Sequence, residues 1–198
     1  RTIYIYRLNI SQTRTIRSGV LPSAVVRGRR NPLHIGFSLR LTRARKAAGL
    51  SPSALSLAVG IAHNTAAHLE AGGRTPRVDT VEKLANTLCV SPCLLAFGQQ
   101  QPYEAITDSL SAGLPARLSQ VRQERAYSRR ELGRRSDTSD NFVQMTETGT
   151  TVPNIAKLEQ LAKALEVSPC WLAFGLGDKE LPQRRSARPV EQSADQSQ

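Results

Sequence analysis

The stretch V-S-P-C-L-L-A-F-G at residues 90–98 returns as V-S-P-C-W-L-A-F-G at residues 167–175. The same offset of 77 positions pairs further residues, such as Arg40 with Arg117 and Glu70 with Glu147. A duplication this long that occurs twice indicates two complete small domains, because solenoid units are about 20 to 50 residues and need about three copies. We therefore expect a first repeat at residues 36–98 and a second repeat at residues 113–175.

Each repeat is predicted to be all-α. Apolar residues recur at helical spacing from Phe37 to Ala48, and Gly49 supplies a stop. Ser51-Pro52 predicts the start of a second helix that ends at Gly60. A third helix is expected to start near His63 and to close at Gly72, a fourth covers residues 81–88, and a fifth follows Ser91-Pro92. With no strand pattern present, five short helices per repeat are expected.

The second and third of these helices carry the pattern of a helix-turn-helix, whose second helix can enter a DNA major groove. Through R-K-A-A-G-L-S (45–51), Gly60-Ile61, L-E-A-G-G-R-T-P (69–76) and L-A-N-T-L-C-V-S-P (84–92), the chain resembles the phage-repressor or Cro-like helix-turn-helix family, also called the XRE type. The resemblance covers both repeats. It implies an all-α fold of two tandem five-helix lambda-repressor-like helix-turn-helix domains with flexible termini.

The resemblance also implies where DNA is read. The first exposed residues of the recognition helix map to His63, Asn64 and His68 in the first repeat, and to Asp140, Asn141 and Gln144 or Met145 in the second. Asn can bond adenine through two groups, His can donate to guanine, and Asp can accept from the cytosine amino group. The alternative for Asn64 and Asn141 is that they only start their helices.

Basic side chains around the motif are candidates for phosphate contact, which positions a protein without reading sequence. The candidates are Arg40, Arg43, Arg45, Arg74, Arg117, Arg122, Arg129, Arg130, Arg134 and Arg135. We expect only a minority to touch DNA, because a solvated helix face explains most basic residues. Arg129 and Arg130 are favoured, since they open the helix beside the recognition helix.

Three departures from the family pattern affect these expectations. Pro52 and Arg129 stand where the second helix commonly begins with Gln, so the first repeat lacks that side chain's contact. In the second repeat Asp137 stands where the turn usually has Gly, and Asp tolerates the left-handed conformation. Ser136 and Thr146 replace apolar packing residues, so a looser second motif is expected.

Composition limits the partners. The chain has 198 residues and a formal charge of +11, and its first 35 residues hold seven arginines and no acid. This balance favours a polyanionic partner, here double-stranded DNA, although solubility alone also explains it. No apolar run approaches the roughly 20 residues that span a bilayer, so no membrane association is expected. A DNA-binding protein of this type is expected to be bacterial or phage-derived, cytoplasmic and associated with the nucleoid.

The rest of the chain is expected to connect or flank the repeats. Residues 1–35 are expected to be a basic segment that is disordered or not native, and residues 176–198 a disordered tail. Residues 99–112 are expected to form a linker. Fourteen flexible residues have an r.m.s. span of roughly 20 Å and an extended reach near 45 Å, so one chain could bridge half-sites about 34 Å apart.

No catalytic, metal or cofactor signature is recognised. Glu70 and Glu147 lie in separate repeats without a partner base, so a structural bond at the end of each recognition helix is expected. Cys89, Cys93 and Cys170 are expected to be small buried thiols in a reducing compartment, not metal ligands and not a disulfide framework. His63 and His68 are five residues apart and do not share a helix face. An enzyme is therefore not expected.

Two functions from different classes remain. The first is a sequence-specific transcription regulator, expected to repress by occupying a promoter, in which the two repeats act as a covalent pseudo-dimer. Because the two recognition helices differ, its site should be asymmetric. The second is a protein interaction module, such as an antitoxin or adaptor that self-associates or binds a protein partner and whose second repeat has lost DNA binding.

Overall fold

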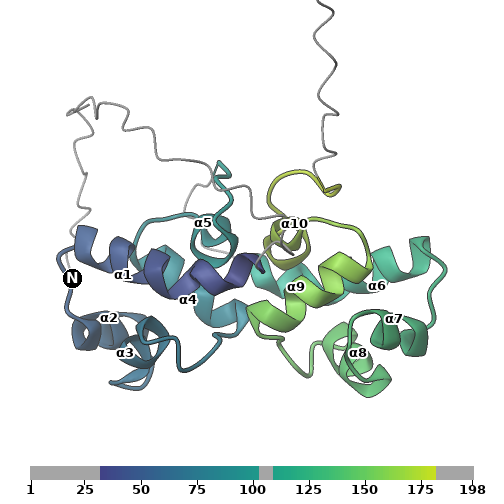
Figure 1. Ribbon diagram of the computed structural model, residues 1–198, viewed down its shortest axis with the longest axis horizontal. Helices are drawn as coiled ribbons and strands as arrows, with labels where there is room; N and C mark the ends of the chain where they lie inside the picture. The colour runs from purple at the N-terminus through teal and green to yellow at the C-terminus, as the bar shows by residue number, and fades with distance from the viewer. Residues whose placement is uncertain (1–31, 103–108, 182–198) are drawn as a thin grey trace, which may run out of the picture. The chain divides into compact units, whose positions relative to one another are not determined.

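The computed structural model describes residues 32–102 and 109–181, which contain helices but no strand (Figure 1). The first repeat consists of η1 (Leu33–Gly36), α1 (Phe37–Ala47), α2 (Pro52–Val59), α3 (Thr65–Glu70), α4 (Val78–Thr87) and α5 (Pro92–Phe97). The second repeat consists of η2 (Leu110–Gly113), α6 (Leu114–Glu124), α7 (Arg129–Arg135), α8 (Asp140–Glu147), α9 (Ile155–Ala164) and α10 (Pro169–Phe174). Two all-α copies in tandem confirm the predicted fold class.

The helix caps explain why the chain turns where it does. Ser51 accepts a hydrogen bond from the Ala54 amide at 3.1 Å and begins α2, and Ser128 accepts from the Glu131 amide at 3.0 Å and begins α7. The turn that follows needs a left-handed residue in both repeats. Gly60 supplies it with φ of 73° and Asp137 with φ of 53°, as the tolerance of Asp for this conformation predicted. The tight turn sets each recognition helix against the helix before it.

Each repeat buries an apolar core between α1 and α2–α5, or between α6 and α7–α10. In the first repeat Leu41, Leu55 and Leu84 are fully buried, and Leu118, Leu132 and Leu161 take the equivalent positions in the second. The buried apolar residues of both repeats form one continuous cluster. The two cores are therefore joined across the contact between the repeats.

The two repeats meet through equivalent positions. Arg77 forms an isolated antiparallel bridge with Asn154, its own counterpart 77 residues later. The Val78 amide donates to the Pro153 carbonyl at 3.0 Å, and the Ile155 amide donates to the Pro76 carbonyl at 3.0 Å. Pairing of each residue with its counterpart is the signature of an isologous, two-fold contact. The repeats are related as the subunits of a symmetric dimer are.

A pair of glutamates repeats this reciprocity. Glu82 of α4 accepts from the Leu110 and Ser111 amides of η2 at 2.5 and 3.1 Å. Its counterpart Glu159 of α9 accepts from the Leu33 and His34 amides of η1 at 2.7 and 3.1 Å. Each repeat thus holds the short helix at the start of the other. These contacts connect the two repeats directly, in addition to the chain that links them.

The cysteines differ from the expectation of three small buried thiols. Cys93 of α5 and Cys170 of α10 are joined in a disulfide, and both are fully buried. Cys89 is free and exposed. The expectation was wrong because Cys93 and Cys170 are counterparts that lie where α5 meets α10. Counterpart positions meet when they lie near the two-fold axis of the contact, and spacing along the sequence does not reveal which positions lie there.

Ordered structure continues at both margins of the repeats. Leu33–Gly36 is helical, and near the C-terminal end Val167 pairs with Glu180 while the Ser168 amide donates to the Lys179 carbonyl at 2.8 Å. The expectations for residues 1–31, 103–108 and 182–198 fall outside the described residues. Among the helices that are described, none has the length and apolar character needed to cross a membrane.

Candidate nucleic-acid interface

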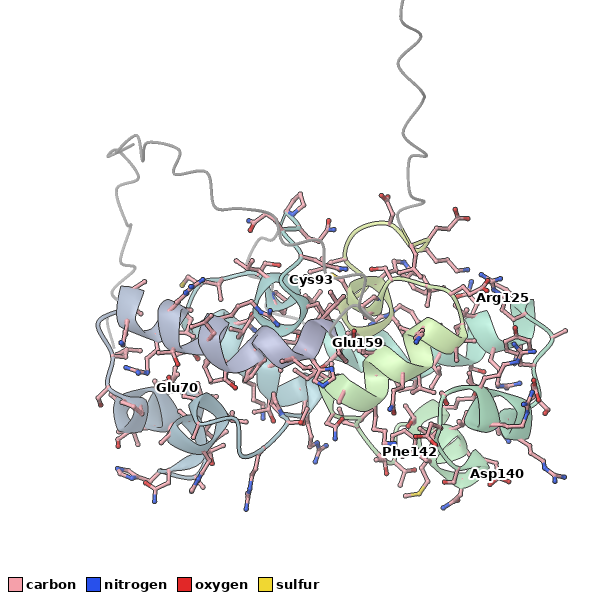
Figure 2. The ribbon with its side chains drawn as sticks, in the orientation of Figure 1. Glu70, Cys93, Arg125, Asp140, Phe142 and Glu159 are labelled. Atoms are coloured by element: carbon pink, nitrogen blue, oxygen red, sulfur yellow. A yellow bond between two sulfur atoms is a disulfide. The ribbon has the colours of Figure 1, made fainter. Side chains whose placement is uncertain are left out.

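The residues expected to read bases lie on or just before the two recognition helices. In Figure 1 the pairs α2–α3 and α7–α8 lie on the same side of the unit that holds residues 32–181. All but one of the predicted side chains are exposed: His63, Asn64, His68, Asp140, Asn141 and Gln144. Met145 is half-buried. Figure 2 shows Asp140 at the start of α8. The structure therefore leaves these groups open to a ligand.

Neither asparagine side chain makes a capping hydrogen bond. Asn64 stands before α3 but makes no capping bond through its side chain, and the Ala66 amide is instead satisfied by Ser56 at 3.1 Å. The Asn64 side-chain oxygen lies 3.1 Å from His63 Nδ1. Asn141 lies in the first turn of α8, whose N-cap is Ser139. The side-chain nitrogen of Asn141 lies 3.6 Å from the Met145 sulfur. Both asparagines stand at the start of their helices, and both side chains are exposed there.

The recognition helices also differ in length. The third helix of the first repeat was expected to start near His63, but α3 begins at Thr65 and has 6 residues. In the second repeat α8 begins at Asp140 and has 8 residues. His63 consequently lies in the turn before its helix, whereas its counterpart Asp140 lies in the first turn of α8. The first of these polar residues therefore has turn conformation in the first repeat and helical conformation in the second.

The expectation of a looser second motif was wrong. Thr146 and Ser136 are buried, but each hydroxyl donates at 2.8 Å to the carbonyl four residues earlier, of Phe142 and Leu132 respectively. Gly133 lets α7 approach the next segment, since a Cβ there would lie 2.9 Å from the Thr138 carbonyl oxygen. The buried hydroxyls are satisfied within their own helices, so they do not weaken the packing.

Two of the arginines considered for phosphate contact are used inside the repeats. Arg40 donates to the Leu95 and Ala96 carbonyls of α5 at 2.8 and 2.6 Å, and its counterpart Arg117 donates to those of Leu172 and Ala173 of α10 at 3.0 and 2.7 Å. Desolvation lowers the pKa of Arg40, and the charge of Glu159 opposes this. Both guanidinium groups satisfy carbonyls near a helix C-terminus and tie α5 to α1 and α10 to α6.

Arg45 and Arg122 are likewise internal. Arg45 donates to both carboxylate oxygens of Glu70 at 2.5 and 2.8 Å, and Arg122 donates to those of Glu147 at 2.5 and 3.3 Å. The hydrogen bond with Glu70 raises the pKa of Arg45. Glu70 is labelled in Figure 2 at the end of α3. The expected structural role of the two glutamates is confirmed: each ties a recognition helix to the first helix of its repeat.

The other arginines are exposed. Arg43, Arg74 and Arg130 form no side-chain hydrogen bond or ion pair within the part of the chain that is described, and all three are exposed. Arg129 donates to Glu147 at 2.8 Å while keeping 46% of its side chain exposed. Arg134 and Arg135 pair with Glu131 at 2.8 and 2.6 Å. The basic surface near α7 is thus partly neutralised, with Arg130 as its unpaired cation among the described residues.

Sequence reasoning missed the residues that arrange the two motifs. Glu82 follows Val78 by four positions and Glu159 follows Ile155 by four, so both acids interrupt the buried face of an amphipathic helix. A carboxylate on the core-facing side of the same helix in both repeats was the available signal; Glu82 is buried and Glu159 is half-buried. No three His, Cys, Asp or Glu side chains among residues 32–102 and 109–181 are grouped to hold a metal ion.

Comparison with known proteins agrees with this geometry. A family model described as "Helix-turn-helix domain" matches residues 37–97, and one described as "Helix-turn-helix" matches residues 118–172. The curated proteins and the solved structures yield no match. Together the two models cover more than half of the chain and fall on the two repeats. The chain therefore belongs to the helix-turn-helix family of the phage-repressor or Cro-like (XRE) type, and its tandem domains are those of a DNA-binding transcription regulator.

Proposed function

We propose that this protein binds one asymmetric site on double-stranded DNA through both repeats at once, as a covalent pseudo-dimer, and represses transcription by occupying that site. The observation that carries the proposal is the reciprocal pairing of counterparts, Arg77 with Asn154 and Glu82 and Glu159 with the opposite short helices. A homodimer reaches this two-fold arrangement with two identical chains. Here one chain supplies both halves.

The two-fold relation defines the layout of the site. Two recognition helices related by a two-fold axis read their half-sites in opposite directions. The half-sites of helix-turn-helix dimers are separated by about 34 Å, which is one helical turn of DNA, or by a multiple of that distance. The half-sites should therefore be inverted with respect to each other. Their separation should be fixed, because the repeats are held by direct contacts and not by the connector alone.

The half-sites should differ in sequence because the exposed side chains differ. The first repeat presents His63, Asn64 and His68, which suit guanine and adenine edges. The second presents Asp140, Asn141 and Gln144, with Met145 beside them, and Asp140 suits the cytosine amino group while repelling phosphate. Each good bidentate contact contributes about 1 to 3 kcal/mol of discrimination. Because each repeat recognises a different half-site sequence, the complete DNA site is asymmetric.

Phosphate contacts in this proposal come from the exposed arginines alone. Arg43 and Arg74 serve the first repeat, and Arg130, with Arg129, Arg134 and Arg135, serves the second. Arg40, Arg45, Arg117 and Arg122 are excluded because each is held by an internal carbonyl or carboxylate. Each contact releases a counterion, so binding should weaken steeply with salt.

One observation favours the second candidate, a protein interaction module. Leu57 of α2 has 80% of its surface exposed, and its counterpart in the second repeat is Arg134. An exposed leucine beside the recognition helix suits an apolar partner more than a phosphate. Single exposed leucines are nevertheless common on protein surfaces, so this candidate ranks second.

Selection of bound duplexes from a random pool at about 150 mM salt tests the proposal. Intact protein should enrich a two-part site, and Asn64→Ala and Asn141→Ala should each lose one part of it. Gln100→Ala, which removes an exposed side-chain amide just after the first repeat, is the matched control and should select the intact site. If no sequence is enriched, the interaction module replaces DNA binding as the explanation. Repression is tested separately, with the selected site placed in a reporter promoter.

A further inference from the structure

We propose that Cys93 and Cys170 form a reversible redox site that sets how firmly the two repeats are docked, and thereby how tightly the protein binds two-part DNA. The co-reactant is a low-molecular-weight thiol or its disulfide. The effect on DNA rests on the function proposed above. The effect on docking does not, and it is measured independently below.

The disulfide lies on the contact between the repeats. Cys93 is on α5 and Cys170 is on α10, and α5 and α10 pack against each other. Figure 2 labels Cys93 on α5. Both cysteines are fully buried, and they are counterparts 77 residues apart. The bond therefore joins one repeat to the other and joins nothing within either repeat.

A continuous set of contacts connects Cys93 to the first recognition helix. Arg40 of α1 donates to the Leu95 and Ala96 carbonyls of α5. Five residues further along the same helix, Arg45 holds Glu70 at the end of α3. A displacement of α5 relative to α10 is consequently passed through α1 to α3.

The second repeat has the same set of contacts. Arg117 of α6 donates to the Leu172 and Ala173 carbonyls of α10, and Arg122 of α6 holds Glu147 at the end of α8. Both recognition helices are thus tied to the helices that carry the disulfide. Fixing α5 against α10 fixes the separation and orientation of α3 and α8.

Without the disulfide, docking depends on weaker interactions. The cross-repeat amide bonds of Val78 and Ile155 remain, as do the bonds to Glu82 and Glu159. The Leu33–Glu159 bond is solvent-exposed, and hydrogen bonds add only modest net stability because they replace bonds to water. The apolar contact between α5 and α10 also remains. The reduced protein should therefore open at the contact more often while each repeat stays folded.

The chemistry is thiol–disulfide exchange. An external thiolate attacks one sulfur, the Cys93–Cys170 bond breaks, and the departing sulfur leaves as a thiolate that takes up a proton. A second external thiolate then attacks the external sulfur of this mixed disulfide, and the remaining cysteine leaves as a thiolate that takes up a proton. The products are two cysteine thiols and one external disulfide, so two electrons pass from the reductant to the protein. Oxidation by an external disulfide is the reverse. Because both sulfurs are buried, exchange requires the α5–α10 contact to open, which couples redox state to docking.

Hydrogen exchange on the full chain carrying Cys89→Ser measures docking without DNA. The Val78 and Ile155 amides donate across the contact and should exchange at least about tenfold faster after reduction by dithiothreitol. The amides of Leu84 and Leu161, inside α4 and α9, should keep their protection and show that both repeats are folded. A protein that also carries Cys93→Ser and Cys170→Ser should show the exchange rates of the reduced form, and these rates should not change when dithiothreitol is added.

Binding to DNA is then measured by fluorescence anisotropy. Reduction should weaken binding to a two-part duplex about tenfold or more and change binding to a duplex with one half-site less than about twofold. Free thiols are counted by alkylation and mass spectrometry in each sample. The redox proposal is overturned if Cys93 and Cys170 stay reduced in an oxidising glutathione buffer, or if the Val78 and Ile155 amides exchange equally in both states. Loss of all duplex binding in both states would instead overturn the proposed function.

Discussion

Replacing Glu82 by alanine should destabilise the protein more than the same change at its counterpart Glu159. Glu82 is 4% exposed. It accepts hydrogen bonds from the backbone amides of Leu110 and Ser111 and from the hydroxyls of Ser109 and Ser111. Truncation leaves two amides without a partner at a part-buried site. At roughly 1 to 2 kcal/mol for each stranded donor, the expected loss is about 3 kcal/mol.

Glu159 gives the matched comparison. Its side chain is 18% exposed, and it accepts from the Leu33 and His34 amides, with His34 Nδ1 2.7 Å from its second oxygen. Water can reach these donors more easily, so Glu159→Ala should cost about half as much, near 1.5 kcal/mol. Glu82→Gln keeps one acceptor oxygen and should fall between wild type and Glu82→Ala.

Urea unfolding of the oxidised wild-type protein and of the three variants measures their free energies of unfolding, compared at equal slope. Hydrogen exchange at Val78 and Ile155, as used above, reports whether the lost stability is at the contact between the repeats. Two results would refute the reasoning that carboxylates accepting from backbone amides hold the repeats together: a loss below about 1 kcal/mol for Glu82→Ala, or a loss for Glu159→Ala that exceeds the loss for Glu82→Ala.

Three further predictions concern individual contacts. Gly133→Ala places a Cβ 2.9 Å from the Thr138 carbonyl oxygen and should lower the free energy of unfolding, measured by thermal unfolding, by about 1 to 3 kcal/mol. In the control Gly73→Ala the Cβ would lie 3.7 Å from the His68 carbonyl oxygen, so the loss should be less than about 1 kcal/mol. Glu147→Ala strands Arg122 and Arg129 and should cost about 3 to 5 kcal/mol by urea unfolding, more than Glu70→Ala, which strands Arg45 alone. Hydrogen bonds from Arg134 and Arg135 lower the pKa of Glu131 to about 2, so its stabilising effect is complete above the unfolded pKa of about 4.3 and is lost as pH falls toward 2. An NMR titration of this carboxyl with a midpoint near 4 would contradict the last of these.

Local structure was predictable because its causes are local. Ser51 and Ser128 cap helices, and Gly60 and Asp137 take the left-handed turn, through interactions within a few residues of each position. The duplication then gave two copies of one domain. The error about Thr146 arose from treating a buried hydroxyl as a packing defect, although its own helix supplies an acceptor four residues back.

The contact between the repeats was not predictable in the same way. Arg40 and Arg117 look like surface cations in a helical pattern, but they satisfy carbonyls 55 and 56 residues away. Cys93 meets Cys170 only because the repeats pack about a two-fold axis through that region. Sequence similarity between two copies indicates that they share a fold. It does not indicate which face of one copy meets the other.

The most direct test of the central claim uses the two half-sites recovered by selection. Duplexes carrying them in inverted or direct orientation, with spacings changed one base pair at a time, are compared by anisotropy at about 150 mM salt. If reciprocal docking fixes the recognition helices, the inverted arrangement at one spacing binds far more tightly than all others. Equal binding across several spacings, or a preference for direct repeats, would contradict a two-fold pseudo-dimer and indicate repeats that act independently through their connector.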